Sequence, residues 1–141
     1  MKRLLLEAPG VVLGLSLLLA TPPTAAAQHK APPGGAYKKA STLAQLPDFL
    51  PGLGILYADP ATLPAGPWPA YDRQGNLVST IYMIPLKDMD AQKAFAGLKT
   101  GKGERVDHVD VVFNAGHPGV AEPHYHIILW YVSAEKAMAL Q

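Results

Sequence analysis

Apolar and polar residues alternate most regularly in the last third of the chain, where the pattern predicts two β-strands. The first runs from Val106 to Phe113 and alternates valine and phenylalanine with a set that contains His108 and Asp110. The second runs from His124 to Val132 and alternates in the same way. Because successive side chains of a strand point to opposite faces, each strand has one apolar face and one face that carries the histidines.

The rest of the chain predicts a small number of further elements. They are a helical turn at Ser41–Leu46, a short strand at Ile55–Tyr57, a hairpin of Trp68–Asp72 and Leu77–Pro85, a main helix at Asp88–Leu98 and a last helix at Ala134–Leu140. Tight hairpins favour antiparallel pairing. The expected fold class is therefore α+β, a single domain with a mainly antiparallel β-sheet and one main helix on one face.

The burial of the last two strands follows from their apolar faces. One face carries Val109, Val111 and Phe113, and its counterpart on the second strand carries Ile127, Leu129 and Tyr131. Both sets are expected to lie against the main helix and the core. The histidine faces of the two strands would then coincide on the other side of the sheet.

The start of the chain resembles a secretory signal. Lys2 and Arg3 precede an apolar run from Val11 to Ala20, and small residues at 25–27 fit a cleavage site. The expected organisation is a signal peptide at 1–27, a flexible leader at 28–45 and an α+β domain at 46–141. This organisation predicts a secreted or periplasmic protein.

Charge and cysteine content narrow the function classes. The chain has 12 basic and 11 acidic residues, and the predicted signal carries Lys2, Arg3 and Glu7, so the remainder is formally neutral. A neutral chain lacks the basic surface by which proteins bind nucleic acid or anionic membranes, and it does little to oppose self-association. The absence of cysteine excludes disulfides, thiol catalysis and iron–sulfur clusters. Beyond the signal, no apolar stretch is long enough to span a membrane.

The histidines supply the candidate chemistry, because four of the five lie between His108 and His126. Imidazole is a common metal ligand, and zinc or copper would need three or four nitrogen or oxygen donors. An antiparallel register that sets His126 opposite Asp110 or His108 would gather them on one hairpin. The candidate metal ligands are His108, Asp110, His117, His124 and His126.

Two other interpretations of the histidines remain open at this stage. In one, they are polar residues on a solvated or subunit-contacting face, and His108 with Asp110 is a hydrogen-bonded pair. In the other, the protein is a metal-dependent hydrolase or lyase that uses Asp110 or Glu122 as its base. The leading hypothesis is a non-catalytic exported protein that self-assembles and binds a metal or small ligand through the hairpin.

Several motifs resemble a family of small exported bacterial proteins known only as a domain of unknown function. They are Leu-Pro-Asp-Phe-Leu-Pro-Gly-Leu-Gly at 46–54, Tyr-Asp-Arg-Gln-Gly at 71–75, the segment 77–85, Val-Asp-His-Val-Asp at 106–110 and Gly-His-Pro-Gly-Val-Ala-Glu-Pro-His-Tyr-His at 116–126. The resemblance covers about three quarters of the chain. It implies an α+β subunit, export and closed homo-oligomers, and it implies no activity.

Overall fold

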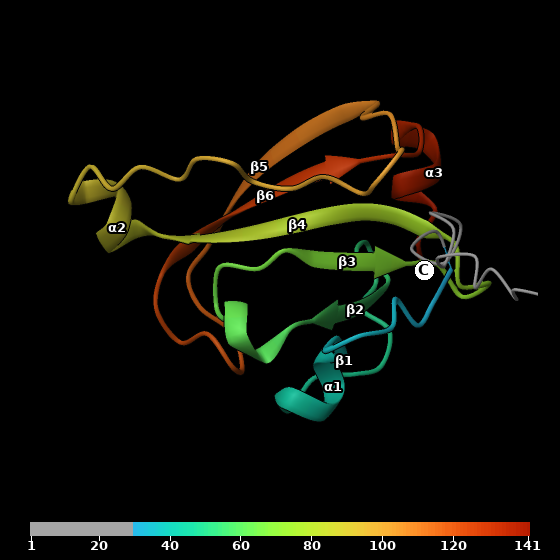
Figure 1. Ribbon diagram of the computed structural model, residues 1–141, viewed down its shortest axis with the longest axis horizontal. Coiled ribbons are helices and arrows are strands. Elements are labelled where there is room, and N and C mark those ends of the chain that lie inside the picture. Colours follow the sequence, from blue (N-terminus) through green and yellow to red (C-terminus); the bar gives the residue numbers. More distant parts are fainter. Residues whose placement is uncertain (1–29) are drawn as a thin grey trace, which may run out of the picture.

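The core of the fold is a six-stranded sheet in the order β1-β2-β3-β4-β6-β5, in which every neighbouring pair is antiparallel (Figure 1). The computed structural model describes residues 30–141. The expected signal peptide at 1–27 lies outside the described residues. The strands are β1 Lys38–Lys39, β2 Ile55–Ala58, β3 Trp68–Tyr71, β4 Leu77–Pro85, β5 His108–Asn114 and β6 His124–Trp130.

The helices of the described residues are all short. They are α1 Ala40–Leu43, the 3-10 turn η2 Pro60–Thr62, α2 Leu86–Asp90 and α3 Ala134–Met138. This confirms the expected fold class, a single α+β domain built mainly of antiparallel sheet. Within residues 30–141, the helices fall well short of the length and apolar character that crossing a bilayer requires.

The predicted hairpin of β3 and β4 is confirmed, and it places β4 in the middle of the sheet. The Asp72 carboxylate accepts hydrogen bonds from the backbone N–H groups of Gln74 and Asn76, which holds the turn closed. All nine residues of β4 are buried. Both faces of β4 are therefore covered by other parts of the protein, which explains why both faces are apolar.

The predicted main helix at Asp88–Leu98 is wrong. Only α2, Leu86–Asp90, is helical, and Gln92 then adopts a φ of 56° that ends the helix. Met89 and Leu98 are 48% and 42% exposed, so two residues of the expected apolar stripe are poorly buried. Without tertiary packing, a short helix of this kind has little stability.

Most of the predicted helix and the residues that follow it form an extended segment, which lies on the face of the sheet that carries Tyr82 and Tyr131. The carbonyl of Lys99 accepts a hydrogen bond from the Tyr82 hydroxyl, and the Gly101 N–H donates to the Tyr131 hydroxyl. The chain from 91 to 107 thus returns along the sheet and leads into β5 (Figure 1).

The predicted burial of the last two strands is also wrong, because the histidine face of β6 points into the core and both faces of β5 are largely exposed. On β6, His124, His126, Ile128 and Trp130 are buried, and the residues between them are only half-buried. On β5, Val109, Val111 and Phe113 are 51%, 63% and 52% exposed. Alternation predicts the two faces of each strand correctly, but apolar content alone does not determine which face is buried.

The histidine face is covered by the segment that precedes β2 and by the end of the chain. Partly buried Leu43, Leu46, Leu50 and Leu53 pack against the same core cluster as Ile128 and Trp130, together with Ala137 and Leu140. Lys38–Lys39 pair with β2, and α1 follows directly. Residues 38–43, which were expected to belong to a flexible leader, are therefore part of the folded domain.

Candidate metal centre

Three of the predicted ligands converge at the start of β6. His117 comes from the loop between β5 and β6, whereas His124 and His126 occupy alternate positions on β6 itself. One nitrogen from each ring lies within 4.8 Å of those of the other two. The Nε2 atoms of His124 and His126 are 2.9 Å apart, and the ring of His117 lies 5.0 Å and 5.7 Å from theirs, centroid to centroid.

Backbone carbonyls fix the orientation of two of these rings. His124 Nδ1 lies 2.7 Å from the carbonyl oxygen of Glu122, and His117 Nδ1 lies 2.9 Å from that of Pro118. A carbonyl oxygen only accepts, so each Nδ1 carries the proton and each Nε2 is left with a lone pair when the ring is neutral. Metal-binding histidines are usually held in this way, with the second ring nitrogen donating to a carbonyl or carboxylate.

Burial keeps His126 uncharged. It is 7% exposed, and desolvation, followed by the neighbouring His124 and His117, lowers its pKa to about 4. At neutral pH the His126 ring therefore has no charge. A neutral imidazole is the form that coordinates metal.

A tight loop brings His117 to β6. The backbones of His117 and Val120 exchange two hydrogen bonds of 2.9 Å and 3.0 Å, and Val120 is buried beneath the loop. Gly116 has a φ of 124°, and a Cβ there would lie 2.5 Å from the carbonyl oxygen of Ala121. Only glycine fits this position, which explains the Gly-His pair at the start of the loop.

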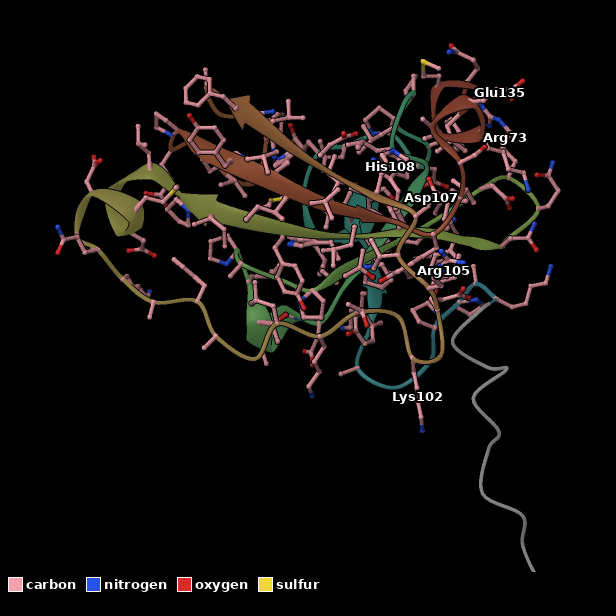
Figure 2. All side chains as sticks on the ribbon, turned by 90° about the horizontal axis from the view of Figure 1, so that it is seen from above. Arg73, Lys102, Arg105, Asp107, His108 and Glu135 are labelled. Atoms are coloured by element: carbon pink, nitrogen blue, oxygen red, sulfur yellow. The ribbon has the colours of Figure 1, made fainter. Side chains whose placement is uncertain are left out.

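The register separates the other two predicted ligands from this cluster. His126 lies opposite Val112, not opposite Asp110 or His108 as expected, and His108 pairs with Trp130. His108 is thus six residues, about 20 Å, along β5 from the level of His124. Figure 2 shows His108 and Asp107 at the end of the hairpin near Glu135 of α3.

His108 and Asp110 have structural partners of their own. The His108 ring stacks on Trp130 with centroids 5.9 Å apart, and its Nδ1 lies 2.9 Å from Asp107 Oδ1. Asp110 Oδ2 accepts a hydrogen bond of 2.8 Å from Trp130 Nε1. The expected pairing of His108 with Asp110 is replaced by contacts of both residues with Trp130.

Glu122 contributes its backbone to the cluster but not its carboxylate. The carboxylate forms an ion pair of 2.6 Å with Lys87. Of the residues predicted from the sequence, the structure thus gathers His117, His124 and His126 and leaves His108, Asp110 and the Glu122 side chain elsewhere.

An apolar cavity adjoins the three histidines. It has a volume of about 240 Å³. Its walls are formed by Leu43, Ala44, Leu46, Leu50, Leu53, Leu56, Leu63, Pro64, Trp68, Met83, Asn114, His117, Pro118, Gly119, Val120 and His126. No pattern in the sequence predicted this cavity, and the leucines between 43 and 56 were the one signal that could have indicated it.

Comparisons with known proteins identify a similar solved structure. No protein-family profile matches the chain, and no curated protein matches it. The crystal structure of a hypothetical protein from Thermus thermophilus is similar, with 46% sequence identity and a TM-score of 0.61. The match covers 67% of this chain and 92% of that one. The chain therefore belongs to the same family as this hypothetical protein from Thermus thermophilus.

Proposed function

We propose that this protein is an exported, non-catalytic, self-assembling protein that binds one divalent transition-metal ion through His117, His124 and His126. The observation that carries the proposal is the convergence of three imidazoles, two of which are oriented by backbone carbonyls. Three neutral nitrogen donors suit zinc or copper(II).

The distances support a compact site. Two nitrogens bound to one tetrahedral zinc, each about 2.0–2.1 Å from the ion, lie about 3.3 Å apart. The Nε2 atoms of His124 and His126 are already 2.9 Å apart, so a small separation of the two rings admits the ion. Three protein ligands leave one coordination position for water or another ligand.

The alternative of a metal-dependent hydrolase or lyase needs a base beside the metal. Asp110 and Glu122 were the candidates, and their carboxylates are held by Trp130 and Lys87. Within residues 30–141, no acidic side chain joins the three histidines in a metal-binding group. This arrangement favours binding over catalysis.

Self-assembly is supported by β5, which is an outer strand of the sheet with one β-strand neighbour. Large apolar side chains cover its outer face, where Val109, Val111 and Phe113 are about half exposed or more. An apolar edge strand promotes association unless something covers it. A second copy of the chain would supply that cover.

Export rests on the basic start and the apolar run of the first 27 residues. We also infer that the resemblance to the exported domain of unknown function reflects common descent. Intact mass of protein recovered from the native host tests export, with loss of residues 1–27 as the expected result. Retention of these residues would contradict a cleaved signal.

Native mass spectrometry with and without a chelator tests the metal site. The expected result is one zinc or copper ion per subunit, in an oligomer, with the ion lost on chelation. His124→Ala should abolish metal binding, and His108→Ala is the matched control that should retain it. Metal-free protein after zinc loading, or equal loss of metal in both variants, would disprove the proposed site.

A further inference from the structure

The cavity shares part of its wall with the proposed metal centre. His117 and His126 line both, whereas His124 is fully buried behind them. A metal ion held by the three histidines would therefore border the cavity. Resting on the proposed function, we propose that the cavity binds a small monocarboxylate with an apolar body, whose carboxylate takes the open position on the metal.

The side chains that line the cavity favour a ligand that is mainly apolar. The wall consists mainly of leucine, proline, valine, methionine and tryptophan side chains, and none of its residues is acidic, lysine or arginine. Burying an uncompensated polar group against such a wall is costly. A ligand that fits must be apolar over most of its surface.

One end of the cavity is polar, and it favours an anion. The polar side chains there are His117, His126 and Asn114, and the Asn114 amide oxygen already accepts a hydrogen bond from Gly116 N–H. A divalent ion with three neutral imidazoles carries two positive charges, which a carboxylate partly neutralises. Oxygen anions are common fourth ligands of zinc.

The volume of the cavity limits the size of the apolar part of the ligand. An apolar cavity of about 150 Å³ holds benzene. This cavity of about 240 Å³ has room for a somewhat larger molecule, such as a medium-length alkyl chain. Octanoate is a suitable probe because its single carboxylate ends an unbranched apolar chain.

Entry is available beside Leu63. This side chain is 41% exposed and lines the cavity, and Leu63, Pro64, Gly119 and Val120 also border a shallow surface depression that reaches Glu122. We therefore expect a ligand to enter the cavity beside Leu63.

Titration calorimetry of octanoate against the full protein, zinc-loaded and metal-free, tests the proposal. We expect at least tenfold tighter binding to the zinc form. Octanoate should also bind more tightly than butyrate, by roughly fourfold for each methylene that enters the cavity. In cobalt(II)-substituted protein, octanoate should change the visible absorption bands of the metal, because it replaces a ligand.

Variants separate the cavity from the metal. Leu63→Trp should fill the mouth and weaken octanoate binding about tenfold while one cobalt ion per subunit remains bound. Met89→Trp is the matched control, since Met89 is 48% exposed and lies outside the cavity wall. Equal effects of the two variants would contradict binding in this cavity.

The two proposals fail in different ways. If zinc binds and octanoate binds equally well to both forms, or leaves the cobalt bands unchanged, the carboxylate ligand is disproved and the metal site stands. If zinc and cobalt do not bind at all, the proposed function fails, and this inference fails with it.

Discussion

The Nε2 atoms of His124 and His126 lie 2.9 Å apart, a hydrogen-bonding distance that requires a single proton between them in the neutral pair. His124 Nδ1 donates to the carbonyl of Glu122, so His124 Nε2 is the acceptor and His126 Nε2–H is the donor. Coordination of one ion by both Nε2 atoms requires the His126 proton to move from Nε2 to Nδ1, which keeps the ring neutral. In the metal-free protein the two rings are therefore hydrogen-bonded to each other, and a bound ion would replace this hydrogen bond.

Stability of the metal-free protein should fall in acid because of His126. Its pKa is about 4 in the fold against an ordinary value of 6.5, so the unfolded chain binds a proton first as pH falls. The stabilisation is complete above pH 6.5 and is lost between pH 6.5 and about 4, with a size of at most about 3 kcal/mol. Urea unfolding in the presence of chelator, at several pH values, measures this loss.

His126→Gln provides the control for the acid effect, because glutamine does not titrate. The variant should be less stable at about pH 7, but its free energy of unfolding should change less between that pH and about pH 4. An unchanged pH slope in the variant would show that other groups cause the acid loss.

Zinc should raise the melting temperature of the wild-type protein. Ligand that binds only the folded state adds about 2.7 kcal/mol at a free concentration roughly 100 times Kd. His124→Ala should remove the response to zinc, because the most deeply buried ligand is lost. Thermal unfolding with and without zinc is the measurement, and a shift of equal size in the variant would assign the effect to other groups.

Gly116→Ala should weaken metal binding through the loop. The added Cβ would meet the Ala121 carbonyl oxygen at 2.5 Å, and the φ of 124° is unfavourable for alanine. The loop must shift, and His117 shifts with it. Metal titration should show at least tenfold lower affinity, whereas Gly103→Ala, in another loop with nothing within 4 Å, should leave affinity unchanged.

The sequence predicted the antiparallel sheet and which histidines share a face, but it did not predict the register between β5 and β6. Alternation put His124 and His126 on one face, and the loop between the two predicted strands contributed His117 to the candidate ligands. The register could not be predicted from alternation, because a shift of two residues keeps every side chain on the same face. Because the observed register differs from the expected one by two residues, Val112 and not Asp110 lies opposite His126.

The sequence also could not show which face of β5 and of β6 is buried. Val111 and Phe113 are more apolar than the histidines, and burial by apolar content alone would place them inside. The core instead forms where the leucines of 43–53 and α3 pack against β6, which is a long-range choice. The predicted helix at Asp88–Leu98 failed for the related reason that Met89 and Leu98 are not buried against the sheet as a helix would require.

The exposed face of β5 makes a prediction about assembly. Val111 is 63% exposed, and Val111→Lys would place a charge in the middle of the proposed subunit contact. We expect the variant to shift to monomer in light scattering after size-exclusion chromatography. Met138→Lys, at a residue 73% exposed on α3, is the control that should keep the oligomer. A monomeric wild type would contradict self-assembly directly.

Ser79 shows that the centre of the sheet is not optimised for stability. Its hydroxyl is fully buried on β4 and has no hydrogen-bond partner among residues 30–141, whereas the adjacent Thr80 hydroxyl accepts a bond of 2.8 Å from Tyr131. A buried unsatisfied hydroxyl costs about 1–3 kcal/mol. Ser79→Ala should therefore stabilise the protein by about 1 kcal/mol in urea unfolding, and Thr80→Val should destabilise it because the Tyr131 hydroxyl loses its acceptor. If Ser79→Ala destabilised the fold as much as Thr80→Val does, the Ser79 hydroxyl would have to be bonded in solution.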